Sequence, residues 1–210
     1  MLFTTSPLAA QSASATIDRA VTAYKAIRTM RGTFEQTIRN PLTGSNLSAR
    51  GEFQQQFPNR IAIRFSDPKG DLLIVDGTVA WLYLPSTNPG QAFKLPAAAG
   101  GSSLNIIEQF LTEPASRYTL TAVGAATVAG RATHAVKLVP KTATREFTQA
   151  TVWIDDATGL IRQFEIVEPT GLVRRILVTD ATLNGPLTAD AFTFTPPKGV
   201  QVIDQTGGRG

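Results

Sequence analysis

The sequence contains no cysteine, and His134 is the one histidine among its 210 residues. Without cysteine, the chain cannot form a disulfide, a thiolate metal site or a lipid-modified N-terminal cysteine. A single histidine with no acidic cluster near it in the sequence does not supply the ligand set of a metal centre. We therefore expect neither a metal nor a cofactor.

Motifs of known catalytic chemistry are absent as well. No serine stands in a G-x-S-x-G setting, and a Ser-His-Asp triad would have to use His134. The acidic pair Asp155-Asp156 begins a turn in "WIDDATGL", where aspartate is favoured for structural reasons. The segment 100–103, "GGSS", could cradle an anion but lacks the lysine and spacing of a phosphate loop. We interpret it as a hinge and helix cap, and we expect no enzyme.

Long apolar runs and clustered charges are also missing. No stretch of 18 apolar residues occurs, so the mature chain is not expected to span a membrane. The net charge is +4, but lysine and arginine are scattered, and the tightest pair is Arg174-Arg175. This pattern lacks the basic stripe that tracks phosphates, so nucleic-acid binding is not expected. An apolar share of 42% in 210 residues is enough for one large folded domain.

The N-terminal residues 1–15, "MLFTTSPLAAQSASA", are small and weakly apolar. "ASA" before Thr16 resembles a signal-peptidase site, although the segment has no positive start and only a short apolar core. We interpret residues 1–15 as the remnant of an export signal, with a disordered tail as the alternative. Residues 16–210 contain no linker or repeat and are expected to form a single domain.

Two amphipathic helices are predicted. The first is capped by Ser14 or Thr16 and runs to about Arg31. The second is capped by Ser102 or Ser103 and is ended by Pro114. Their apolar stripes include Ile17, Val21 and Tyr24 in the first helix and Ile107, Phe110 and Leu111 in the second.

The remaining sequence is typical of short antiparallel strands. In residues 71–85, "DLLIVDGTVAWLYLP", Asp76-Gly77 is a strong hairpin signal. Both flanking strands are apolar on both faces, which raises the question of what covers the second face. Similar segments predict ten or eleven strands, the last of them an edge strand closed by Pro196-Pro197. The predicted fold is mainly β (α+β): one curved antiparallel sheet forming an unclosed half-barrel, with helices on its concave side.

The predicted inward faces of these strands are rich in large apolar residues. Periodicity cannot distinguish a filled core from a ligand cavity, so a packed core is the simpler interpretation at this point. The residues concerned are Phe34, Phe53, Ile61, Ile63, Phe65, Leu73, Val75, Trp81 and Tyr83.

Three motifs in order carry a family resemblance. "RGTFEQTI" follows the first helix, "LLIVDGTVAWLY" surrounds the Asp-Gly turn, and "AFTFTPPKGVQVIDQ" lies near the C-terminus. With these motifs at this spacing, the chain from about Ala15 resembles the periplasmic outer-membrane lipoprotein carrier protein family (LolA type). The resemblance implies an unclosed barrel with a helical lid and a cavity for lipoprotein acyl chains.

Under this resemblance, the nine strand residues line the cavity and the six helix residues belong to the lid. The second face of the hairpin would then meet the lid or the cargo. Acylated lipoproteins would come from an inner-membrane ABC-type release complex and go to an outer-membrane receptor. The resemblance further implies a monomer in the periplasm of a Gram-negative bacterium.

One position departs from the family pattern. Before its Pro-Asn the family often has an arginine that helps to hold the lid closed, and this chain has Phe57 there. We expect lid closure to rely on apolar contact or on another arginine, such as Arg60 or Arg64. Alternative functions are a receptor-like or lipid-sensing module of the same fold, a carrier of another lipid, and an enzyme of a type not visible in the motifs.

Overall fold

The computed structural model describes residues 7–97, 106–144 and 146–207. Its helices are α1 (Pro7–Lys25), α3 (Ile106–Leu111), α4 (Pro114–Arg117) and the 3-10 helix η1 (Ala189–Phe192). The strands are β1 (Thr29–Arg39), β2 (Asn46–Gln56), β3 (Arg60–Asp67), β4 (Lys69–Val75), β5 (Val79–Tyr83), β6 (Gln91–Pro96), β7 (Tyr118–Val128), β8 (Arg131–Pro140), β9 (Gln149–Asp155), β10 (Ile161–Val167), β11 (Val173–Leu183) and β12 (Gln201–Asp204).

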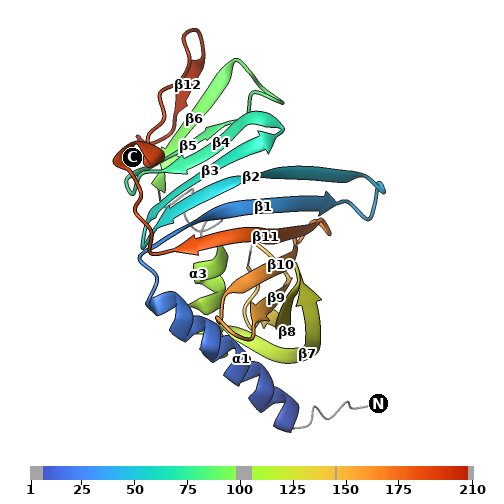
Figure 1. Cartoon of the computed structure of the whole chain (residues 1–210). Coiled ribbons are helices and arrows are strands. Elements are labelled where there is room, and N and C mark those ends of the chain that lie inside the picture. The colour runs from blue at the N-terminus through green and yellow to red at the C-terminus, as the bar shows by residue number, and fades with distance from the viewer. Residues whose placement is uncertain (1–6, 98–105, 145, 208–210) are drawn as a thin grey trace. The chain divides into compact units, whose positions relative to one another are not determined.

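The twelve strands form one sheet in the order β12-β6-β5-β4-β3-β2-β1-β11-β10-β9-β8-β7 (Figure 1). Strands β7 and β12 lie at its two ends, so the sheet does not close on itself. Successive strands such as β3–β4 and β8–β9 pair antiparallel, whereas β12 runs parallel to β6. This confirms the predicted mainly β fold with one unclosed sheet and few helices, with twelve strands in place of ten or eleven.

The chain separates into two compact units. Unit 1 contains residues 1–26, 36–48 and 107–179, and unit 2 contains residues 27–35, 49–106 and 180–210. Each unit draws on separate parts of the chain, and β1, β2 and β11 contribute residues to both. A single carrier-like domain over residues 16–210 remains a prediction.

In unit 1, α1 packs against β7, β8 and β9 (Figure 1). Its residues Ile17 and Tyr24 are buried. The β9–β10 turn lies directly under the helix, since a Cβ added to Gly159 would come within 2.9 Å of the Ala23 Cβ. Helix α1 is thus a fixed part of the unit 1 core.

The helix boundaries differ from those predicted. Helix α1 begins at Pro7, not at Ser14 or Thr16, because proline fits the first helical turn and the following alanines favour helix. It ends at Lys25 because the chain enters β1 at Thr29. Position 15 therefore lies inside a helix and does not mark a structural boundary. No helix in the described ranges is long and apolar enough to cross a membrane.

Two proline-based predictions also require correction. Pro114 begins α4, where it occupies the first turn, and does not only end the preceding helix. The predicted caps Ser102 and Ser103, like the segment 100–103, lie outside the described residues.

The segment before Pro196-Pro197 is no edge strand, because η1 occupies residues 189–192 and the last strand is β12. Proline lacks the N–H that a strand would donate, so strand pairing resumes only after Val200.

In unit 2, β4 and β5 form the predicted hairpin. The Asp76 Oδ1 atom accepts hydrogen bonds from the N–H groups of Thr78 (2.7 Å) and Val79 (2.9 Å), and Gly77 has a φ of +103°. Only glycine adopts this φ without strain, so it suits its place in the turn between Asp76 and Val79, where the Asp76 N–H donates to the Val79 carbonyl oxygen at 3.1 Å.

The face of this hairpin that carries Ile74 is covered by the segment 187–194. Ile74 and Ala62 form a buried cluster with Ala191 and Phe192. Leu72, Trp81, Leu187 and Phe194 pack against this cluster. The expectation that this face meets the lid helices or the cargo is therefore wrong for Ile74 and its neighbours, because the C-terminal segment already occupies it.

Candidate functional site

The opposite face of the unit 2 sheet carries a continuous apolar row. Directly paired residues of neighbouring strands project from the same face of a sheet, so the pairing defines which side chains lie together. One row crosses six strands from β2 to β12. It consists of Phe53, Ile63, Leu73, Leu82, Phe93 and Ile203.

A second row lies beside the first and consists of Ile61, Val75, Ala80 and Leu95. Phe65 belongs to the same face of β3, and its ring meets that of Phe34 edge-on with 5.5 Å between the centroids. We call these two rows with Phe34 and Phe65 the apolar face. It is the candidate site, because it collects large hydrophobic side chains on one side of the sheet.

Much of the apolar face is incompletely buried. Leu73 and Val75 are 8% and 4% exposed, whereas most of the other members are only half-buried. By comparison, Ile74 on the opposite face is fully buried. Half-buried side chains in the apolar face are Phe53, Ile61, Ile63, Phe65, Leu82, Phe93, Leu95 and Ile203. A face of this composition can bury further apolar surface, which an apolar ligand would provide.

The structure brings seven of the nine predicted cavity residues onto the apolar face and excludes two. Trp81 pairs with Ile74 and Tyr83 pairs with Leu72, so both project from the opposite face. Their rings contact Phe194, with centroid distances of 5.6 Å and 5.5 Å. Grouping Trp81 and Tyr83 with Leu73 was wrong because, across this hairpin, odd-numbered residues of β4 share a face with even-numbered residues of β5.

Sequence reasoning missed four large members of the apolar face: Leu82, Phe93, Leu95 and Ile203. The signal for Leu82 was present, because a two-residue turn gives the odd-numbered residues of one strand even-numbered partners in the other, and in the structure Leu73 pairs with Leu82. The other three could not be found this way. Their place depends on β6 pairing with β5 and on β12 pairing parallel to β6 across more than a hundred residues of chain.

Three of the six predicted lid residues belong to the core of unit 1. Ile17 and Phe110 are fully buried, and Phe110 meets the rings of Phe147 and Phe164 edge-on at 5.7 Å and 5.6 Å. Burial raises the pKa of Tyr24 to about 12. Val21, Ile107 and Leu111 are half-buried. Only these last three retain the exposed apolar surface that a lid would use.

The predicted lid-lock position has its own contacts. The Phe57 N–H donates a hydrogen bond to the Arg28 carbonyl oxygen at 2.9 Å, and the phenyl ring is half-buried. Arg60 donates from Nε to the Asp76 carbonyl oxygen at 3.0 Å. Arg64 donates to the Ala191 carbonyl oxygen at 2.9 Å from the face that carries Ala62. Both arginines thus make contacts within unit 2, and a part of either in closing a lid remains a prediction.

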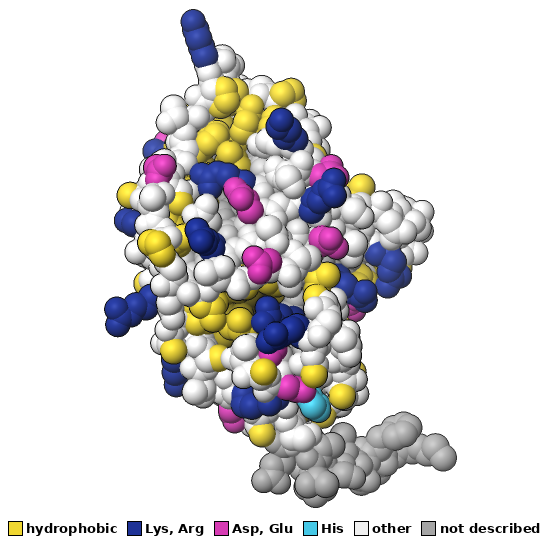
Figure 2. Space-filling view, viewed as in Figure 1, with side chains coloured by type: hydrophobic (Ala, Val, Ile, Leu, Met, Phe, Trp, Pro, Cys, Tyr) yellow, Lys and Arg dark blue, Asp and Glu magenta, His cyan; other side chains and the backbone are white. Residues whose placement is uncertain are grey.

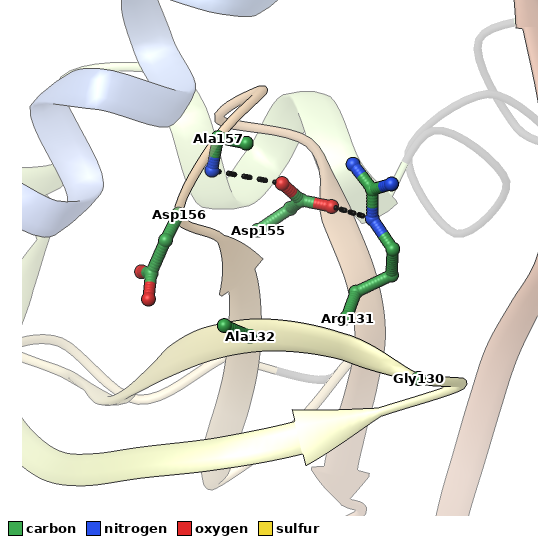
Figure 3. A pocket seen from close by; sticks show the side chains of 6 residues that line it. All are labelled: Gly130, Arg131, Ala132, Asp155, Asp156 and Ala157. Atoms are coloured by element: carbon green, nitrogen blue, oxygen red, sulfur yellow. Dashed lines mark hydrogen bonds and ion pairs between the residues drawn. The ribbon is translucent and has the colours of Figure 1, made fainter.

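A depression of about 250 Å³ lies in unit 1 beside the Asp155-Asp156 turn (Figure 3). The Asp155 side chain is 1% exposed and accepts hydrogen bonds from Arg131 Nε (2.8 Å), Arg162 Nε (3.0 Å) and the Ala157 N–H (2.9 Å). Burial alone would raise the pKa of Asp155, but these donors outweigh it and hold that pKa well below its ordinary value. The carboxylate is saturated by structural partners, in agreement with its interpretation as a turn residue.

Asp156 points away from Asp155 in Figure 3 and makes separate contacts. Its Oδ1 atom lies 2.7 Å from His134 Nδ1 and 3.3 Å from Arg19 Nη2. The bond with His134, together with Arg19, lowers the pKa of Asp156. Within the described residues, no group of three or more histidine, aspartate or glutamate side chains is placed to hold a metal ion. These contacts attach α1 to β8 and to the turn after β9.

On the face shown in Figure 2, lysine and arginine side chains are interspersed with aspartate and glutamate side chains. Several charged side chains among the described residues are paired, including Arg174 with Glu168 at 2.9 Å and Arg175 with Glu165 at 2.7 Å. The Arg174-Arg175 pair is therefore used for contacts between β11 and its neighbours, and it does not form a free basic stripe.

One protein family matches most of the chain. The family model described as "Outer membrane lipoprotein carrier protein LolA" matches residues 25–195. The chain is 28% identical over 179 residues to an outer-membrane lipoprotein carrier protein of Erwinia tasmaniensis, which covers 85% of this chain and 83% of that one. It is 28% identical over 172 residues to a protein of the same name from Haemophilus ducreyi, covering 82% and 77% of the two chains.

Among solved structures, the chain is similar to an uncharacterized conserved protein from Thermus thermophilus. The TM-score is 0.60 at 14% identity, over 93% of this chain and all of the other. At this identity the similarity concerns the fold alone.

Proposed function

Because the chain belongs to the outer membrane lipoprotein carrier protein family, we propose that it carries lipoproteins by holding their acyl chains against the apolar face of unit 2. The observation that carries the proposal is the row from Phe53 to Ile203, which crosses six strands and remains half-buried over most of its length. A packed core would leave less of this surface exposed.

The dimensions of the row support an acyl ligand. Neighbouring strands lie about 4.8 Å apart, so six strands present a row roughly 24 Å long. An acyl chain in one leaflet spans roughly 15 Å, half the thickness of the bilayer's hydrocarbon core. The row is therefore long enough to hold an acyl chain that lies across the strands.

Release of the cargo requires that the free energy of burying its acyl chains is partly offset. Each buried methylene contributes about 0.8 kcal/mol, so one chain of about 14 methylenes would contribute roughly 11 kcal/mol if fully enclosed. Several chains held in this way would be bound too tightly for release. A carrier needs part of this energy to be offset, and we propose that displacing Ile107 and Leu111 of α3 from apolar contacts supplies the opposing cost.

The proposed route follows from the family. The chain would accept acylated lipoproteins from an inner-membrane ABC-type release complex and deliver them to an outer-membrane receptor in the periplasm of a Gram-negative bacterium. The curated relatives named above carry lipoprotein-carrier names, which supports a carrier and not an enzyme. The signal-like composition of residues 1–15 supports export.

Native mass spectrometry tests the proposal. Delipidated protein would be mixed with a triacylated lipoprotein, with free fatty acid or with phospholipid. We expect a 1:1 complex with the lipoprotein that is lost in Phe93→Asp, because a carboxylate within the row cannot be buried against an acyl chain. Binding of phospholipid but not lipoprotein would identify a carrier of another lipid.

A matched pair on β12 controls for damage to the fold. Ile203 lies on the apolar face, and its neighbour Val202 lies on the opposite face and is 42% exposed. Ile203→Asp should weaken lipoprotein binding, whereas Val202→Asp should not. Equal loss in both variants, or no complex with the unmodified protein, would contradict the proposal.

A further inference from the structure

The two most exposed large hydrophobic side chains among the described residues lie on one hairpin. Leu42 is 85% exposed and Leu47 is 65% exposed, and the next most exposed is Val123 at 59%. Leu42 lies in the connection between β1 and β2, Leu47 is the second residue of β2, and both belong to unit 1. We call residues 40–47 the leucine hairpin. A single exposed leucine is common, but two at one end of a hairpin form a local concentration of apolar surface.

The leucine hairpin is held in an ordered turn. The Asn40 Oδ1 atom accepts hydrogen bonds from the N–H groups of Leu42 (3.0 Å) and Thr43 (3.4 Å), and the backbone N–H of Asn40 donates to the Ser45 carbonyl oxygen at 2.9 Å. The Thr43 and Ser45 hydroxyls lie 2.9 Å apart. These bonds hold the turn in a defined conformation, in which Leu42 is exposed to solvent.

The charge of the segment indicates the kind of surface that the leucine hairpin would contact. Residues 40–48 contain no charged side chain, so none has to be desolvated when this segment enters an apolar phase. The charged residues that flank it along the chain are Arg39 and Arg50, of which Arg50 lies 3.8 Å from the Asp67 carboxylate on β3, and no acidic residue occurs between Glu35 and Glu52 in the sequence. The whole chain has a net charge of +4. Leucines flanked by arginine suit an interface where lipid tails meet anionic headgroups.

We propose that the leucine hairpin is a membrane-contact element that inserts Leu42 and Leu47 into the surface of a bilayer containing anionic phospholipid. Two leucines and one or two arginines provide only weak attachment, which suits repeated short visits and not permanent anchoring. The contact is separate from the apolar face, because it uses different residues and needs no cargo. It would bring a carrier to the surface at which cargo is exchanged.

The absence of cysteine permits a site-specific test. Leu42→Cys would be labelled with an environment-sensitive nitrobenzoxadiazole dye, with Val123→Cys labelled in the same way as a matched exposed position on β7. Cargo-free protein would be mixed with vesicles of phosphatidylethanolamine and phosphatidylglycerol or with neutral phosphatidylcholine vesicles. We expect the dye at position 42 to shift to the blue with anionic vesicles, and the dye at position 123 to remain unchanged.

Sedimentation of the unlabelled protein with the same vesicles removes any contribution from the dye. Leu42→Asp/Leu47→Asp should reduce the bound fraction at least about tenfold, because burial of each leucine accounts for roughly a tenfold change in partition. High salt should weaken binding of the unmodified protein to anionic vesicles. If the unmodified protein does not bind the vesicles, or if the double variant binds them equally well, the proposal is overturned. The leucine hairpin would then be assigned to contact with a protein partner.

This test separates the membrane contact from the carrier function. The vesicles contain no lipoprotein, and the double variant leaves the apolar face intact. Loss of vesicle binding with retained lipoprotein binding would support both proposals. If the unmodified, delipidated protein does not bind lipoprotein, the carrier function is contradicted. The result with vesicles is independent of that outcome.

Discussion

The indole ring of Trp81 packs edge-on against the phenyl ring of Phe194, with 5.6 Å between their centroids. Tyr83 stacks on the same phenyl ring at 5.5 Å. These contacts explain why both faces of the β4–β5 hairpin are apolar. One face is covered by the C-terminal segment 187–194, which leaves the other for the proposed cargo.

The first prediction concerns this C-terminal cover. Phe192 is 3% exposed in a buried cluster with Ile74, so Phe192→Ala should lower the free energy of unfolding by about 3–5 kcal/mol. Urea denaturation followed by tryptophan fluorescence measures this change. Thr195→Ala, at an exposed position nearby, is the control and should change stability by less than about 0.5 kcal/mol. A similarly small effect of Phe192→Ala would mean that the C-terminal segment contributes little to the free energy of unfolding.

The second prediction concerns the contact of α1 with the β9–β10 turn. Gly159 has a φ of +73°, and a Cβ there would meet the Ala23 Cβ at 2.9 Å and the Arg19 carbonyl oxygen at 3.0 Å. Gly171 has a similar φ of +85° but nothing within 4 Å. Gly159→Ala should therefore be more destabilising than Gly171→Ala by about 1–3 kcal/mol, the range for overpacking. Equal melting temperatures would show that α1 can move away from the turn at little cost.

The third prediction concerns the buried carboxylate of Asp155. Its pKa is held well below the ordinary value of about 4, so its contribution to stability is present above that pH. The contribution is lost as the pH falls below about 4 toward the folded-state pKa. Asp155→Asn removes the charge that faces Arg131 and Arg162 and should cost about 3–5 kcal/mol near neutral pH.

Thermal unfolding between pH 3 and pH 7 measures the effect. The stability difference between the unmodified protein and Asp155→Asn should shrink at the acidic end. Asp156→Asn is the control, because Asp156 is partly exposed and its loss should lower the melting temperature much less. A stability difference that does not vary with pH would argue against a depressed pKa of Asp155.

The fourth prediction concerns position 57. A phenyl ring donates no hydrogen bond, whereas a guanidinium offers five donors to helix carbonyl groups. If this position meets a closing helix, Phe57→Arg should slow amide hydrogen exchange in α3 roughly tenfold, in line with the strength of a charge-assisted bond. Phe57→Leu should leave the exchange unchanged. An unaltered exchange rate in Phe57→Arg would show that position 57 does not control the lid.

The sequence determined much of this architecture because local patterns suffice for local structure. Alternation of apolar residues predicted the strands, and Asp76-Gly77 predicted the hairpin that the structure contains. Turn preferences gave the structural role of Asp155. The ordered motifs gave the family before any contact was known. In each case the deciding interactions lie within a few residues along the chain.

Only the tertiary structure decided which apolar residues belong together. Every residue of β4 and β5 flanking the turn is apolar or aromatic, so hydrophobic patterning could not separate Leu82, on the apolar face, from Trp81, under Phe194. Phe93 and Ile203 meet on adjacent strands although more than a hundred residues separate them in the chain. The helical spacing of its apolar neighbours suggested that Phe110 belongs to a lid. In the structure, its ring contacts those of Phe147 and Phe164, which come from distant segments of the chain. Such contacts depend on strand order and long-range packing, which short-range periodicity does not encode.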